Sequence, residues 1–105
     1  MNLTISGHHL EITTPIKEYI ETKLTRVSRH IDNIIDTQVI ISKDVNQQIA
    51  EITLRVPGKD LHAESSHENL YAAIDLLIDK IDRLVLKHKE KQQSFTKEAN
   101  KHLSA

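Results

Sequence analysis

A β-hairpin is predicted by the stretch QIAEITLRVPGKDLHAES, residues 48–65. Over residues 48–56, apolar side chains alternate with polar ones, which is the period of a strand that buries one face. Pro57 and Gly58 follow where the alternation stops. Proline fixes φ and glycine permits a positive φ, so this pair is typical of a turn. Because the alternation resumes over residues 61–65, we expect two antiparallel strands with one apolar face.

Two more strands are expected on the N-terminal side of this hairpin. In residues 2–6, apolar and polar side chains alternate, and Gly7 is expected to end the strand. Residues 37–42 are rich in β-branched side chains, which favour an extended conformation. A polar turn separates them from the hairpin. The predicted sheet therefore has four strands.

Two helices complete the predicted domain. Apolar residues recur at helical spacing from Pro15 to His30, where Thr14 suits the N-cap and proline suits the first helical position. The same spacing runs from Glu68 to Lys91, with Ser66 as the expected N-cap. On a helical wheel, the second helix directs one apolar stripe towards the core. This stripe consists of Leu70, Ile74, Leu77, Ile81, Leu84 and His88.

The element order β-α-β-β-β-α predicts an α+β fold. Each strand has one apolar face and each helix one apolar stripe, so the stable arrangement is a two-layer sandwich with both helices on one face of the four-stranded sheet. The other sheet face would meet water. It carries Thr4, Gln38, Ser42, Glu51, Thr53, Arg55, His62 and Glu64. Residues 1–91 are expected to form one domain, and residues 92–105 a polar, flexible C-terminal tail without sustained periodicity.

Composition excludes several functions for this 105-residue chain. The absence of cysteine removes disulfides and thiolate metal sites and fits the cytoplasm. No stretch approaches the ~20 apolar residues of a membrane span, and the N-terminus lacks the pattern of a signal peptide. The histidines show no metal-ligand spacing, and no glycine-rich phosphate loop or catalytic constellation exists. We therefore expect a cytoplasmic protein that is not an enzyme and uses no metal, cofactor, small-molecule substrate or membrane.

Charged residues are sorted by direction although the net charge is only −1. On the second helix, one flank of the stripe is basic, and the outer and opposite side is acidic with Asp75, Asp79 and Asp82. The basic flank consists of Lys80, Arg83, Lys87 and Lys91. The first helix has a matching flank of Lys23, Arg26, Arg29 and His30. If both flanks border a shared groove between the helices, they form one basic surface.

These basic residues have two interpretations. Lysines and arginines on helices are often only a solvated face, and those near a helix C-terminus also interact favourably with the helix dipole. However, cations one helical turn apart lie ~5 to 6 Å from each other, a spacing comparable with successive phosphates on a nucleic-acid strand. The sorting onto matching flanks favours a polyanion-binding surface. Tyr71 is expected to pack against the sheet edge rather than to stack on a base.

Three segments of the chain resemble the bacterial ribosome hibernation promoting factors. The strongest similarity is LYAAIDLLIDKIDRLVLKHKEK, residues 70–91. NLTISGHHLEIT at 2–13 and IAEITLRVPGKDLHAES at 49–65 are similar to other segments of the same family. The chain matches the short class, also called ribosome-associated inhibitors or ribosomal subunit interface proteins. The family's fold is the sandwich predicted above, and it is similar to double-stranded RNA-binding domains.

This resemblance implies a translation silencer that binds the small ribosomal subunit at the decoding channel, where tRNA and mRNA would sit, in stationary phase or stress. Its partners would be ribosomal RNA and nearby ribosomal proteins, and the chain would be a monomer off the ribosome. By position, the family's RNA-binding residues correspond to Lys80, Arg83, Lys87, His88, Lys89 and Lys91 on the second helix and to Lys23, Arg26 and Arg29 on the first. His88 also falls on the predicted core stripe.

The C-terminal tail and the partner leave alternatives open. Long family members carry a second domain, for which this chain has no room. Some short members act with a ribosome modulation factor to form ribosome dimers, whereas others hold single ribosomes idle. The tail QQSFTKEANKHLSA, residues 92–105, lacks a strong acidic run, which favours the dimer-promoting type. Two other functions are a general double-stranded RNA-binding module and a protein-interaction module that uses the acidic segment Asp60–Asp79.

Overall fold

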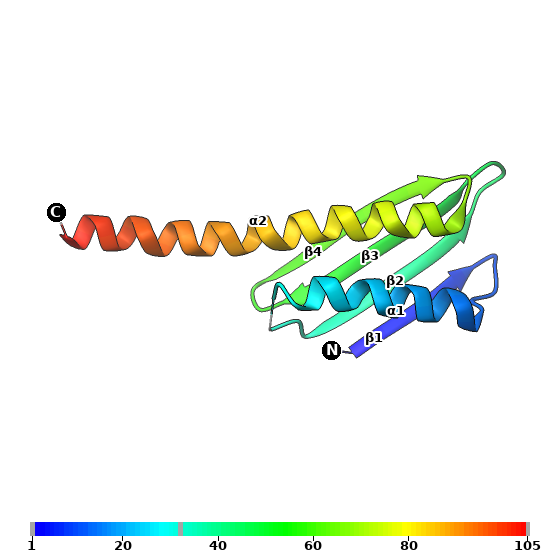
Figure 1. Cartoon of the computed structure of the whole chain (residues 1–105), viewed down its shortest axis with the longest axis horizontal. Coiled ribbons are helices and arrows are strands. Elements are labelled where there is room, and N and C mark those ends of the chain that lie inside the picture. The colour runs from blue at the N-terminus through cyan, green and yellow to red at the C-terminus, as the bar shows by residue number, and fades with distance from the viewer. Residues whose placement is uncertain (1, 32, 105) are drawn as a thin grey trace.

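Two helices lie on one face of a four-stranded sheet in the computed structural model of the chain (Figure 1). The structure describes residues 2–31 and 33–104, and describes side chains for residues 2–31 and 33–89. The elements are β1 (Asn2–His8), α1 (Thr14–Ser28), β2 (Asp36–Lys43), β3 (Gln48–Val56), β4 (Lys59–His67) and α2 (Leu70–Ser104). The predicted α+β sandwich is confirmed.

The sheet is mixed, with the strands in the order β1-β2-β3-β4. β1 and β2 are parallel, with Ile5 opposite Val39, because α1 carries the chain back across the sheet between them. The other neighbours are antiparallel. At the predicted hairpin, Val56 pairs with Lys59, so Pro57 and Gly58 alone connect β3 to β4. Gly58 has a φ of 79°, the left-handed conformation that glycine adopts without steric cost.

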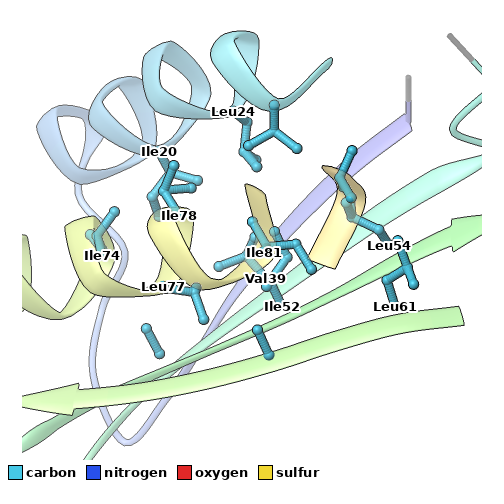
Figure 2. Packing of buried hydrophobic residues seen from close by; sticks show 14 of the residues in the cluster. Ile20, Leu24, Val39, Ile52, Leu54, Leu61, Ile74, Leu77, Ile78 and Ile81 are labelled. Atoms are coloured by element: carbon cyan, nitrogen blue, oxygen red, sulfur yellow. The ribbon is translucent and has the colours of Figure 1, made fainter. Parts of the chain in front are cut away.

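The core lies between the sheet and the two helices (Figure 2). Alternating residues of the central strands point into it, as the sequence pattern predicts. α1 contributes Ile20, Leu24 and Val27, all about 1% exposed. Nearly the whole core consists of aliphatic side chains, and residues such as Leu3, Ile16 and Ile31 pack around its margin. All residues predicted for the open sheet face, from Thr4 on β1 to Glu64 on β4, are exposed or half-buried.

Strand ends differ from the predicted ones because strand pairing continues past them. Gly7 does not end β1, which pairs with β2 as far as His8. β4 begins at Lys59 and ends at His67, so Ser66 lies in this strand and is not the N-cap of the second helix. That role belongs to Asn69, whose Oδ1 accepts hydrogen bonds from the backbone N–H groups of Tyr71 at 2.9 Å and Ala72 at 3.2 Å.

The helix ends also differ from the prediction. α1 begins one residue earlier, at Thr14, and ends at Ser28 rather than His30; its N-cap is Thr13. α2 begins at Leu70 and runs to Ser104, beyond the predicted end at Lys91. The polar sequence after Lys91 has no apolar periodicity, which is why sequence reasoning ended the helix there. The flexibility of residues 92–105 stays a prediction. None of the helices in the described residues is long and apolar enough to span a membrane.

The buried stripe of α2 is rotated from the predicted one. Ile74, Leu77 and Ile81 are buried as predicted, but Leu70, Leu84 and His88 are only half-buried. Their places in the core are taken by Ala73, Ile78 and Val85. The reason is that α2 packs against α1 as well as the sheet, so the helix buries the side that faces both neighbours. Figure 2 shows Ile78 lying beside Ile20 of α1.

Candidate nucleic-acid interface

The basic flank of α2 lies along the open edge of β4. Lys80, one helical turn before Arg83, donates from its Nζ to the backbone carbonyl of Glu64 at 2.8 Å. The side chains of Lys80, Arg83 and Lys87 border an open hollow of about 320 Å³ between β4 and α2. The structure therefore brings together three of the predicted α2 cations at one surface, as their spacing of three and four residues requires.

The opposite flank of α2 faces α1 and is acidic. The Tyr19 hydroxyl donates to the Asp75 carboxylate at 2.5 Å, and Lys23 Nζ lies 3.7 Å from the same Asp75 oxygen. About two turns further along α2, His30 Nδ1 lies 2.7 Å from Asp82 Oδ1. The two helices run parallel (Figure 1), so residues further along α1 meet residues further along α2. We call these contacts the interhelical ladder.

The prediction of one shared basic groove between the helices is wrong. Lys23 and His30 of α1 do face α2, but the residues that they meet there are Asp75 and Asp82. A helical wheel gives the two flanks of α2 without telling which flank faces its neighbour. The sheet order decides this: α2 packs on β3 and β4, and α1 lies over β2 and β1 (Figure 1). The basic flank is therefore on the β4 side of α2, where Lys80 Nζ donates to the Glu64 carbonyl. Asp82, expected to face solvent, has a side chain only 19% exposed.

The remaining predicted residues have different environments. Arg83 forms an ion pair with Asp79 one turn earlier, at 3.0 Å, and both side chains are well exposed. Arg26 and Arg29 are exposed on α1, as are Lys87 and Lys89 on α2. Among the residues with described side chains, no carboxylate lies within ion-pair distance of these four cations. His88 is half-buried and has a contact within the protein. The side chain of Lys91 lies outside the described residues.

Sequence reasoning missed the interhelical ladder. The Tyr19 and Tyr71 rings meet edge to face, with centroids 4.9 Å apart, so Tyr71 packs on α1 rather than on the sheet edge. Lys23 Nζ lies 5.3 Å from the Tyr19 ring centroid. The hydrogen bond to Asp75, with a smaller effect of burial, raises the pKa of the Tyr19 phenol. The sequence contains one signal for this contact: the side chains of Tyr19, Lys23 and His30 recur at the spacing of a helix–helix contact.

The histidines form no metal site in the part of the chain that the structure describes. The His8 and His9 rings meet edge to face, with centroids 4.2 Å apart. His62 Nδ1 lies 3.1 Å from the Thr53 hydroxyl on the open sheet face, within hydrogen-bond distance. The described residues therefore offer no group of metal ligands. The basic flank of α2 is the strongest candidate site.

A row of cations along one helix of a small α+β sandwich is the electrostatic pattern expected of a polyanion-binding protein. Residues 3–93 match the family model described as Sigma 54 modulation protein / S30EA ribosomal protein. A ribosome hibernation promoting factor from Pseudomonas putida is 50% identical over 95 residues, which cover 90% of this chain and 93% of that relative. One from Azotobacter vinelandii is 48% identical over 92 residues, covering 88% of this chain and 86% of the relative.

Among solved structures, the crystal structure of the N-terminal domain of Thermus thermophilus Protein Y superposes with a TM-score of 0.78. It is 35% identical, and the match covers 84% of this chain and 99% of that domain. The chain therefore belongs to the ribosome hibernation promoting factor family, as the three sequence segments predicted. Members of this family are ribosome-binding proteins without enzymatic activity, which confirms that the chain is not an enzyme.

Proposed function

We propose that this protein binds the small ribosomal subunit at the tRNA and mRNA decoding channel and silences translation in the cytoplasm during stationary phase or stress. The observation that carries the proposal is the alignment of Lys80, Arg83 and Lys87 on one outward flank of α2 in a member of a hibernation factor family. Occupation of the channel would exclude tRNA and mRNA sterically, so no bond needs to be made or broken.

The contact with ribosomal RNA is best supported on α2. Lys87 has no carboxylate partner among the described side chains, and Lys80 is hydrogen-bonded to a neutral carbonyl, so both keep their full charge available for phosphates. Arg83 would leave its exposed ion pair with Asp79 to bind a phosphate, and this costs little because exposed ion pairs contribute little to stability. Arg26 and Arg29 add exposed cations on α1. Lys23 contributes less because it is engaged in the interhelical ladder.

The experiment that tests this site is co-sedimentation with purified small subunits at moderate salt. Reversing two charges, Lys80→Glu with Lys87→Glu, is expected to weaken binding at least ~100-fold, because two phosphate contacts are replaced by repulsion. The matched control is Lys43→Glu with Lys59→Glu, which changes the net charge equally at exposed positions on β2 and β4. Equal binding by the two double variants would refute the assignment of the site to α2.

We also propose that the protein favours ribosome dimers together with a ribosome modulation factor. The support is the composition of residues 92–105, which contain no strong acidic run. In a sucrose gradient, the full chain with the modulation factor is expected to shift ribosomes into the dimer fraction. A chain that ends at Lys91 should retain this effect. Ribosomes that stay single with the full chain and dimerise only with the shortened chain would assign it to the inhibitors of single ribosomes.

A further inference from the structure

The hollow between β4 and α2 has a chemistry that phosphate contacts alone do not use. Its rim carries Lys80, Arg83 and Lys87, but its surface is mostly apolar and is formed in part by Ala63 and Leu84. A row of phosphates needs only exposed cations. An apolar floor beneath such a row adds affinity only when a flat or apolar group of the ligand enters it.

From this juxtaposition we propose that the hollow receives one unpaired nucleobase of RNA, while the surrounding cations bind the phosphates on either side. The inference rests on the proposed function and names the form of RNA that the same surface recognises. A paired base cannot enter, because its faces are covered by its neighbours in the helical stack. A bulged or looped-out base exposes both faces and carries a phosphate at each side of its sugar.

Size and charge both fit this occupant. The volume of about 320 Å³ is roughly ten times the share of one water molecule, ~30 Å³, and lies at the small end of ligand pockets. His62, the sixth residue around the hollow, has its ring oriented by the contact of Nδ1 with the Thr53 hydroxyl, which leaves Nε2 for a base edge. Three cations around an apolar floor match a nucleotide in an RNA strand, because the flat face of its base is apolar and the phosphates on either side of its sugar are negatively charged.

The test compares two short RNA hairpins that differ by a single bulged adenosine. The full-length protein is expected to bind the bulged hairpin about ten-fold more tightly than the fully paired one, in line with the stacking of one base. Equal affinity for the two hairpins would overturn the proposal. So would displacement of both hairpins alike by a leucine-containing acidic peptide, because the hollow would then suit a protein partner.

Two tryptophan variants locate the effect in the hollow. Leu84→Trp places an indole where the base would lie and is expected to abolish the preference for the bulge. Leu86→Trp is the matched control, because Leu86 is exposed on the same helix outside the hollow; it should keep the preference. The chain has no other tryptophan, so indole fluorescence and thermal unfolding verify that each variant folds. Retention of the preference by a folded Leu84→Trp variant would contradict the assignment.

A lysine variant separates this proposal from the proposed function. Lys87→Gln is expected to weaken both hairpins by the same factor, ~3- to 10-fold, because it removes a phosphate contact and leaves the apolar floor intact. If small-subunit binding depends on Lys80 and Lys87 while the two hairpins bind equally, the ribosomal function stands and the base-binding hollow falls. A bulge preference without any dependence of ribosome binding on these lysines would support the hollow and refute the ribosomal site.

Discussion

At the scale of single residues, Gly58 makes the tight connection between β3 and β4 possible. Its φ of 79° places it in a region where a side chain strains the backbone, although open space surrounds the position where a Cβ would lie. We expect Gly58→Ala to lower the free energy of unfolding by about 1 kcal/mol. Gly58→Asn should cost less, because asparagine tolerates this conformation better. Urea denaturation measures both, and equal effects would contradict the conformational explanation.

The raised pKa of Tyr19 leads us to expect that the folded protein loses stability in alkaline solution. Its hydrogen bond to Asp75 raises the pKa of the phenol in the folded state above the unfolded value of about 10. The folded protein then holds this proton more tightly, so the contribution is complete below about pH 10 and disappears as the pH rises through the folded pKa. Tyr19→Phe is expected to remove this part of the alkaline decline, and Tyr71→Phe, which keeps the Tyr19–Asp75 hydrogen bond, to retain it. Denaturant midpoints measured against pH provide the comparison.

At the scale of elements, substitutions on two faces of α2 show which face packs into the core. Ile78 lies outside the stripe that the wheel predicts, yet it is only 3% exposed and packs beside α1. We expect Ile78→Ala to lower the free energy of unfolding by about 2 to 5 kcal/mol, as for other buried aliphatic truncations. Leu76→Ala, at a position 44% exposed on the same helix, should change it by less than about 1 kcal/mol. Similar effects at both positions would show that α2 does not present this face to the core.

The strands and the existence of both helices are predictable from sequence because their periodicities are local. Residues 50–56 alternate without exception, and the aliphatic residues of α1 recur at helical spacing. The side of α2 that meets α1 is not local information. It depends on the strand order and on the parallel course of the helices, and no helical wheel contains either of these. For that reason the sequence predicts that Lys80, Arg83 and Lys87 share one flank of α2, but it does not predict on which side of the helix that flank lies.

At the scale of the whole molecule, charge is arranged in bands across the helical layer. The acidic band of Asp75, Asp79 and Asp82 separates the cations of α1 from the basic flank of α2. This separation explains how a chain with a net charge of −1 keeps a cationic edge. The grouping of basic residues on one flank of each helix was therefore predictable from sequence. Their division over two separate surfaces was not, because it arises from tertiary contacts.

Asp79 is the carboxylate in these bands that competes most directly with phosphate, since it holds Arg83 at 3.0 Å. We expect Asp79→Asn to strengthen small-subunit binding about two- to five-fold and to steepen its salt dependence, because it releases a cation from a weak exposed pair. Glu18→Gln makes the same change in net charge on the exposed surface of α1 and should have a smaller effect. Binding measured across a salt series distinguishes local release of Arg83 from a general change of charge.

The contact between Lys80 and the Glu64 carbonyl has a consequence for how the molecule behaves in concentrated solution. β4 is the last strand of the sheet, and its outer backbone groups are a template on which a strand of another copy can grow. A positively charged side chain laid onto one of those carbonyls obstructs the template and repels the same side chain of an approaching copy. We therefore expect Lys80, which contacts RNA in the proposed complex, also to limit edge-to-edge aggregation of the unbound protein.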